Sequence, residues 1–366
     1  MKACSQYQGK RYSGPRNEIR LKAYEINPIL DPRWSEYLAR NPQASVFHSP
    51  GWLDALQRTY KYEPIVYTTS PPGTALRNGW VFCRIDSWLT GQRLVSLPFS
   101  DHCDPLVVDR EDLNCLANAV REDQQRLKWK YVEFRSPALE PSVPNGFKAS
   151  EEFCLHRLDL GPALGELFSK LNKDSTQRKI RRAEREGLVY EEGQSEELLE
   201  RFYCLLRLTR QRHRVPPQPR KWFSNLVACL GDRVKIRVAS SRGKPLASIL
   251  TLRFQDTLVY KYGGSDLRFH NLGGMHLCLW RAIEDAKAAG LKELDLGRSD
   301  LRDHGLITFK DRWGSRASRL IYFRQWLQEP RTIIPAWERP RAKKALAHIP
   351  SAFLSSTGRL LYRHLG

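Results

Sequence analysis

The chain has 366 residues, of which 41% are hydrophobic, so it is long enough to form two domains of ordinary size. Its 60 lysines and arginines outnumber its 40 acidic residues and give a formal net charge of +20 at pH 7. This excess favours a polyanionic partner such as tRNA or anionic lipid, although a basic soluble protein would share it. The sequence has no signal-peptide pattern and no apolar run near the roughly 18 residues of a membrane span, which predicts a cytoplasmic protein.

A first unit is predicted over residues 21–147. Ser49 and Pro50 suit the cap and first turn of a helix, which we expect over 51–60. The apolar patterns further predict strands over 65–69, 80–85 and 93–97, a helix over 113–127, and a strand over 131–135. Three prolines within 136–146 indicate the connection between two domains.

A second unit, predicted over residues 148–326, repeats this order. We expect helices over 176–186 and 196–211, strands over 234–239, 246–254 and 257–262, a helix over 275–289, and a strand over 293–296. Asp174 and Ser175 would cap the first of these helices, and Gly290 would end the third. Three strands, a helix and a strand thus occur twice, which predicts two copies of one fold packed side by side.

Both ends of the chain are expected to be basic tails. Residues 1–20 are rich in Lys, Arg, Gly and Ser, a composition typical of disorder. Within the C-terminal tail, residues 327–366, apolar side chains between 353 and 362 could form a short amphipathic helix. That helix would contact an anionic membrane peripherally or pack on the second domain. The second alternative is favoured, because membrane binding usually needs another signal.

Two basic clusters indicate a phosphate-binding surface in the second unit. The helix predicted over 176–186 carries five positive side chains, which are Arg178, Lys179, Arg181, Arg182 and Arg185. Another cluster follows over 207–214. A charge run is usually a solvated helix face, but five cations on one short helix exceed what solubility needs. We therefore expect a polyanion such as tRNA to bind here.

Gly273 and Gly274 mark a second place where phosphate could bind. They open an apolar helix directly after a strand and a turn. Free N–H groups at a helix N-terminus suit a pyrophosphate such as that of coenzyme A. The alternative interpretation is a helix start with flexible glycines.

Lys310 is the residue that we expect to act in catalysis. It lies between Phe309 and Trp313 in a stretch too apolar for a free loop, after a segment at 297–299 that is predicted to be a turn. A lysine held against aromatic rings beside a cleft can stabilise a developing oxyanion. His304 is the candidate general base.

The eight cysteines predict neither a metal site nor a covalent nucleophile. No pair has C-x-x-C spacing, no cysteine lies at metal-ligand spacing from a histidine, and the sequence has no Gly-x-Ser-x-Gly motif. We therefore expect reduced thiols, no metal and no tightly bound cofactor.

Several motifs occur in a fixed order over roughly residues 45–325. They are Phe47-His48-Ser49-Pro50-Gly51-Trp52, Leu97-Pro98-Phe99-Ser100-Asp101, the basic run 178–187, the segment 260–265, Gly297-Arg298-Ser299, and Phe309-Lys310-x-x-Trp313-Gly314. Together they resemble the FemAB-like and BioF-like members of the GNAT acyltransferase superfamily. The resemblance implies an α/β fold of two tandem GNAT domains, with mixed β-sheets flanked by helices and the active site in the second domain.

The resemblance also implies roles for individual residues. The Fem branch moves an amino acid from aminoacyl-tRNA to a peptidoglycan precursor, and the lysine of its Phe-Lys pair lies at the transfer site, which matches Phe309 and Lys310. Substrate-binding roles are implied for Thr209, Arg212, Tyr262, Asp101, Arg298 and Ser299. A basic residue that contacts acceptor phosphates in Fem enzymes is replaced by Leu56 here.

Three functions follow as hypotheses. The first is an N-acyltransferase that takes an aminoacyl group from aminoacyl-tRNA to an amine on a cell-envelope precursor. The second is an acyl-CoA-dependent N-acyltransferase in envelope polysaccharide or lipid synthesis. The third is an inactive RNA- or membrane-binding scaffold, against which the retained Phe309-Lys310 pair argues.

Overall fold

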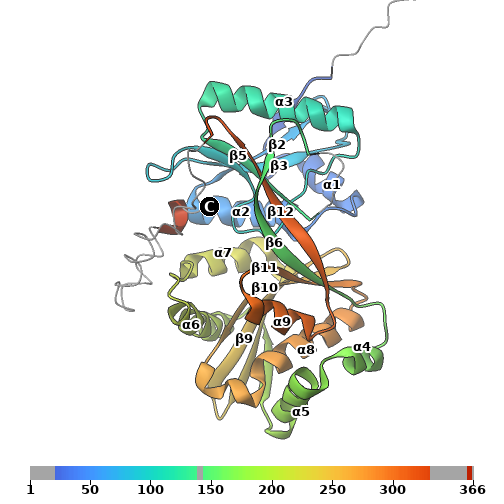
Figure 1. Ribbon diagram of the computed structural model, residues 1–366, viewed down its shortest axis with the longest axis vertical. Helices are drawn as coiled ribbons and strands as arrows, with labels where there is room; N and C mark the ends of the chain where they lie inside the picture. The colour runs from blue at the N-terminus through green and yellow to red at the C-terminus, as the bar shows by residue number, and fades with distance from the viewer. Residues whose placement is uncertain (1–20, 138–142, 330–360, 365–366) are drawn as a thin grey trace, which may run out of the picture.

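The computed structural model of the chain describes residues 21–137, 143–329 and 361–364 (Figure 1). The tail predicted over 1–20 lies outside these residues. The same holds for most of the predicted C-terminal tail, including the start of its expected amphipathic helix. Tyr362 of this tail packs against Phe99, with ring centroids 5.7 Å apart, and its hydroxyl donates a hydrogen bond to the Pro216 carbonyl.

The strands form one twelve-stranded sheet in the described part of the chain, in the order β1-β2-β3-β4-β5-β12-β6-β11-β10-β9-β8-β7. The strands of the first half are β1 (Tyr24–Ile26), β2 (Glu63–Thr68), β3 (Trp80–Ile85), β4 (Arg93–Ser96), β5 (Tyr131–Ser136) and β12 (Arg316–Trp326). Those of the second half are β7 (Val189–Gly193), β8 (Val234–Ser241), β9 (Lys244–Phe254), β10 (Thr257–Ser265), β11 (Glu293–Asp300) and β6 (Lys148–Asp159).

The two halves of the sheet have the same internal order, as the sequence predicts. Each begins with four antiparallel strands, continues with one parallel pair, and ends with an antiparallel strand. A helix crosses between the two parallel strands in each half: α3 (Arg110–Leu127) joins β4 to β5, and α8 (Gly274–Ala288) joins β10 to β11. The repeat is therefore present within a single continuous sheet.

The two halves of the sheet exchange their last strands. β6 follows β5 along the chain but pairs with β11, whereas β12 follows β11 but pairs with β5. The two exchanged strands also pair with each other, from Arg316 opposite Arg157 to Arg324 opposite Lys148. Figure 1 shows β6 and β12 passing each other at the centre of the molecule. The sequence analysis did not predict either strand, so it did not anticipate this exchange.

The remaining helices cover the sheet and join the halves. They are α1 (Pro32–Arg40), α2 (Pro50–Tyr60), α4 (Leu164–Lys170), α5 (Arg178–Arg185), α6 (Glu196–Arg212), α7 (Arg220–Leu230) and α9 (His304–Asp311). α2 of the first half packs on α7 of the second, where the buried rings of Trp52 and Trp222 meet edge to face with centroids 5.1 Å apart. One hydrophobic cluster thus spans both halves, so the two units share a core.

Two local expectations are wrong. The segment at 297–299 is not a turn but part of β11, which bulges between Asp295 and Arg298 and places Gly297 at φ 72°. Glycine suits this left-handed conformation because it has no Cβ. The basic helix α5 has no side-chain cap; a π-helical turn, Lys173–Gln177, precedes it, and Asn172 caps this turn in place of the predicted residues. The start of this turn is tied to the end of α9, since the Asn172 N–H donates to the Arg312 carbonyl.

Candidate active site

Lys310 is buried at the bulge of β11. The parallel ladder between β10 and β11 covers only Thr257–Val259 and the residues opposite, and the bulge follows directly. Lys310, near the end of α9, donates through Nζ to the carbonyls of Gly297 at 2.7 Å and Arg298 at 3.0 Å. Its side chain is only 2% exposed, and burial lowers its pKa to about 8 against the opposing effects of nearby carboxylates. The lysine therefore holds the bulge and sits at its centre.

Asp101, Lys261 and Arg298 surround the bulge. Asp101 accepts a hydrogen bond from Lys261 Nζ at 2.8 Å and lies 3.9 Å from Arg298 Nε. The guanidinium of Arg298 stacks over the ring of Phe153, 4.1 Å from its centroid. Burial lowers the pKa of Lys261, and the charge of Asp101 opposes this effect. The structure thus brings the predicted Asp101, Arg298 and Lys310 together.

Lys261 is a component that the sequence analysis missed. Its ammonium group lies 5.1 Å from the ring centroid of Phe47 and 5.9 Å from that of Trp52, two residues of the first-half motif. Lysines in strands usually face solvent, so only its place beside the Tyr-Gly-Gly-Ser segment could have suggested a buried role.

Tyr262 and Thr209 have structural contacts, whereas Arg212 is exposed. The Tyr262 hydroxyl accepts a hydrogen bond from Trp222 Nε1 at 2.9 Å, and its ring is buried. Thr209 on α6 accepts from the Ser265 N–H at 2.9 Å through Oγ1 and so fixes α6 to the end of β10. Arg212 ends α6 on the surface. Of the three, only Arg212 presents a free surface to a large acceptor.

The start of α8 is enclosed by cations. Gly273 has φ 82°, and a Cβ there would lie 2.2 Å from the backbone oxygen of Lys179, so close packing of α5 requires glycine at this position. Burial lowers the pKa of His276, in the first turn, to about 3, and the charges of Lys179, His270 and Arg312 add to this effect. Neighbouring cations thus converge on the helix N-terminus, an arrangement that suits a phosphate group.

The predicted basic residues of α5 face different surroundings. Arg178, Arg181 and Arg185 are exposed, while Lys179 is partly buried beside α8. Arg181 lies over the ring of Phe168, 5.3 Å from its centroid, and Arg182 lies 3.4 Å from Glu186. The predicted Gly274 starts α8 near the side chains of β8 and β9, where its Cβ position would lie 3.2 Å from the Ala247 Cβ. The backbone of Lys179 on α5 lies against Gly273, so the exposed arginines of α5 lie on a helix that packs against the start of α8.

α9 carries the other two predicted catalytic residues. Phe309 packs edge to face with His276, with ring centroids 5.6 Å apart, and so connects α9 to the start of α8. His304 is the first residue of α9 and is exposed, whereas Lys310 lies at the buried end of the same helix. This separation makes His304 a weaker candidate base than its position in the sequence suggests. Ser299, further along β11, is buried, and its Oγ has no hydrogen-bond partner among the described residues.

Cys154 and His156 lie beside Lys310, which the sequence analysis did not expect. Cys154 is partly exposed and His156 is fully buried, and the two residues lie two positions apart on β6. The Cys154 Sγ lies 3.7 Å from both ring nitrogens of His156, and His156 Nε2 lies 3.1 Å from Asp311 Oδ1. The sequence analysis weighed cysteine–histidine spacing only for metal binding and did not predict this pair. The Cys-Leu-His spacing could have indicated it, because residues i and i+2 of a strand share a face.

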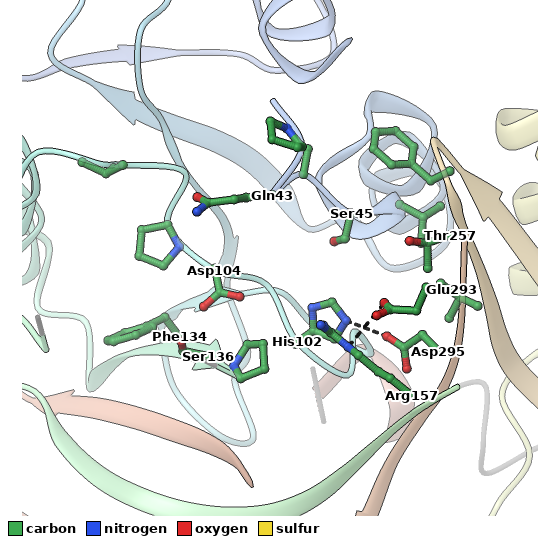
Figure 2. Close-up of a pocket in the computed structure, with 18 of the residues that line it drawn as sticks. Gln43, Ser45, His102, Asp104, Phe134, Ser136, Arg157, Thr257, Glu293 and Asp295 are labelled. Atoms are coloured by element: carbon green, nitrogen blue, oxygen red, sulfur yellow. Dashed lines mark hydrogen bonds and ion pairs between the residues drawn. The ribbon is translucent and has the colours of Figure 1, made fainter. Parts of the chain in front are cut away.

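A cavity of about 620 Å³ lies between the two halves, at the amino ends of β10 and β11 (Figure 2). His102 projects into it and lies 2.8 Å from Asp295 Oδ2, while Arg157 lies 3.6 Å from Glu293. The other oxygen of Asp295 accepts from the Gly297 N–H at 2.7 Å. Asp295 therefore connects this cavity to the bulge that Lys310 holds.

Residues 172–310 match the model of a family described as acetyltransferase (GNAT) domain. This segment is a GNAT domain. It contains the basic residues of α5, the start of α8, the bulge and Lys310, so the features described above lie within the GNAT domain or directly beside it. No curated protein matches the chain by sequence.

The fold of the whole chain is similar to three solved structures. FemX has a TM-score of 0.65 at 14% identity, with 83% of this chain and 97% of FemX covered. L-PGS from Bacillus licheniformis has a TM-score of 0.52 at 12% identity, with 93% and 98% covered. A tandem GNAT protein from the clavulanic acid biosynthesis pathway has a TM-score of 0.52 at 11% identity, with 84% and 99% covered.

These findings confirm the predicted α/β fold of tandem GNAT units and the resemblance to FemAB-like GNAT proteins. With a GNAT domain over residues 172–310, the chain is an acyltransferase. Within residues 21–137, 143–329 and 361–364, no cluster of His, Cys, Asp and Glu side chains is arranged to hold a metal ion. In the same part of the chain, no helix has the length and apolarity needed to cross a membrane.

Proposed function

We propose that this GNAT enzyme transfers an aminoacyl group from aminoacyl-tRNA to an amine on a cell-envelope precursor, in the cytoplasm or at the inner face of the membrane. The observation that carries the proposal is that Lys310 lies on α9, and that α9 contacts the start of α8, where the basic residues of α5 also lie. Lys310 lies near the end of α9, and Phe309 makes the contact with the start of α8. A donor whose phosphates lie on α5 and the start of α8 would present its acyl carbon near the bulge.

In this reaction the acceptor amine must be neutral when it attacks the ester carbonyl. Lys310 and a backbone N–H would polarise the carbonyl oxygen, where negative charge develops, and the ribose hydroxyl would leave. Asp101, Lys261 and Arg298 lie on the other side of the bulge and would contact the acceptor. Leu56 replaces the basic residue that contacts acceptor phosphates in Fem enzymes, so we favour an amine acceptor other than a nucleotide-sugar peptide.

An acyl-CoA donor is the alternative, favoured by the cations around the start of α8. The single basic site there matches one pyrophosphate, whereas tRNA would also use the exposed face of α5. The enzyme would serve envelope polysaccharide or lipid synthesis in that case. Neither donor requires a tightly bound cofactor.

Purification without added ligand, followed by extraction and mass spectrometry, should distinguish the two donors. We expect tRNA to co-purify at low salt and to be released as the salt concentration rises, because phosphate contacts dominate such binding. Recovery of acyl-CoA without tRNA would contradict the first proposal and support the second.

The exposed face of α5 gives a second test. Changing Arg178, Arg181 and Arg182 together to alanine should weaken tRNA binding and reduce the slope of log affinity against log salt by about one for each lost phosphate contact. Filter binding at several salt concentrations measures this slope. A triple alanine variant of Arg110, Arg126 and Lys130, exposed on the first half, removes the same charge and should leave the slope nearly unchanged. Equal slopes for both variants would show that α5 makes no specific contacts.

A further inference from the structure

Cys154, His156 and Asp311 form a connected row beside Lys310. Cys154 and His156 project from the same face of β6, because they are two residues apart on one strand. Asp311 ends α9, the helix that also carries Lys310. The distances are 3.7 Å from the Cys154 Sγ to the His156 ring nitrogens and 3.1 Å from His156 Nε2 to Asp311 Oδ1.

This order of groups matches that of a nucleophile, its base and the residue that orients the base. In the tautomer with the proton on Nε2, His156 would donate to Asp311, and Nδ1 would be free to accept the thiol proton. Burial and the charge of Lys310 lower the pKa of His156, so its imidazole is neutral at neutral pH. Burial also raises the pKa of Cys154, so the resting group is a thiol. The thiol must therefore lose its proton to His156 as it attacks.

Two further groups, Ser299 and Lys310, lie close to Cys154. Ser299 is directly opposite Cys154 in the β6–β11 ladder, so the two side chains share a face of the sheet. Its buried Oγ has no hydrogen-bond partner among the described residues, and a carbonyl oxygen would provide one. Lys310 supplies positive charge next to Asp311 in sequence and is close enough to affect the pKa values of both Cys154 and His156.

We propose that Cys154 is a catalytic nucleophile that carries the acyl group as a thioester between an activated acyl ester or thioester donor and the acceptor amine. The proposal rests on the acyl transfer proposed above, and it replaces the direct attack of the amine on the donor by two successive transfers, first to Cys154 and then to the amine. Sulfur attacks the donor carbonyl while His156 takes the thiol proton. The donor's leaving group then departs with that proton. The amine attacks the new thioester, the carbon–sulfur bond breaks, and the released sulfur regains a proton through His156.

Among the other described cysteines, Cys103 also lies beside a histidine, with its Sγ 3.3 Å from His48 Nε2, but this thiol is buried and the imidazole contacts the Asp104 carbonyl instead of a carboxylate. Cys204 is exposed on α6 and provides a control. A simple exposed thiol such as Cys204 should react with electrophiles at an ordinary rate, whereas Cys154 should depend on its neighbours.

p-Nitrophenyl acetate, an activated ester, tests the covalent step without knowledge of the natural donor. We expect one acetyl group on Cys154 of the full chain, located by peptide mass spectrometry after an acid quench. The Cys154→Ala variant should lose it, and Cys204→Ser should retain it. General-base catalysis typically contributes about 100- to 10,000-fold, so His156→Gln should slow acetylation by at least about 100-fold.

Because His156 is buried, His156→Gln could slow acetylation by disturbing the fold. Asp311→Asn is therefore the second variant: Asp311 is half exposed, and asparagine preserves its shape. This variant should slow acetylation of Cys154 while leaving the melting temperature and the reaction of Cys204 unchanged. Acetylation of Cys154 at the wild-type rate in Asp311→Asn and His156→Gln would overturn the proposal.

Transfer to amines separates this proposal from the proposed function. If Cys154→Ala still transfers acyl groups to an amine at the wild-type rate, the covalent step is wrong and the acyltransferase assignment stands. If Cys154 is acetylated with full dependence on His156 but neither aminoacyl-tRNA nor acyl-CoA is used, the nucleophile stands and the proposed donors are wrong.

Discussion

Replacing Lys310 by methionine is expected to lower the rate of acyl transfer by about 100- to 1000-fold, because loss of one donor to a developing oxyanion typically costs roughly 2.7–4 kcal/mol. Methionine keeps the length of the side chain and its packing near Phe309. It also leaves the carbonyls of Gly297 and Arg298 without their partner, so we expect the melting temperature to fall as well. Single-turnover rates with saturating donor, together with donor affinity and thermal unfolding, separate the two effects.

The pH dependence of the wild-type enzyme checks this role independently of any variant. Burial lowers the pKa of Lys310 to about 8, so the side chain is charged below that pH and neutral above it. A step that needs the charge should slow as the pH rises through about 8. For the Lys310→Met variant, normal folding together with transfer at the wild-type rate would show that Lys310 only supports the bulge.

Replacing Glu133 by alanine is expected to destabilise the protein by about 3–5 kcal/mol, because it would leave the buried Arg135 without a counter-charge and Arg324 with Glu151 alone. Glu133 is 2% exposed and bonds Arg135 at 2.9 Å on its own strand and Arg324 at 2.6 Å on the exchanged strand β12. Urea unfolding monitored by tryptophan fluorescence measures the change. Glu152→Ala is the matched control, since its pair with Arg319 also joins β6 to β12 but is exposed and should contribute less than about 1 kcal/mol.

The same carboxylate gives stability a pH dependence with a definite sign. Burial alone would raise the pKa of Glu133, but the charges of Arg324 and Arg135 outweigh it and lower the pKa to about 2. Its pKa in the unfolded chain is roughly 4.3. The contribution to stability is therefore present above about pH 4.3 and is lost as the pH falls from there through 2. Equal losses of stability for the Glu133 and Glu152 variants would contradict this account.

Local patterns in the sequence predict most single elements and their repeated order. β3 over Trp80–Ile85 matches its prediction at both ends, and α6 differs by one residue. These elements have clear apolar periodicity and, for α6, a serine cap. β6 and β12 were not predicted from the sequence. Their pairing is set by contacts between residues more than 150 positions apart, which local patterns do not report.

Some residues of the candidate site were predicted from the sequence and others were not, for a similar reason. Lys310, Asp101 and Arg298 lie in motifs that the resemblance marked, and the structure brings them together. The glycine at 297 indicated a turn, and the bulge satisfies the same need for a left-handed residue inside a strand. Lys261 and the row of Cys154, His156 and Asp311 depend on tertiary contacts between β10, β6 and α9. The Cys-Leu-His spacing on β6 could have indicated the pair of Cys154 and His156, but no spacing in the sequence joins β6 to α9 or to β10.

The exchange of β6 and β12 also has a consequence for synthesis on the ribosome. The first half emerges with β1 to β5 complete, but the strand that closes it lies at residues 316–326, near the end of the described chain. Until that strand is made, β5 keeps an unpaired edge, and β6 lacks one of its two neighbours. The sheet of the nascent first half therefore stays incomplete at β5 until β12 has been synthesised. Pausing during translation of the second half would prolong the exposure of an adhesive edge.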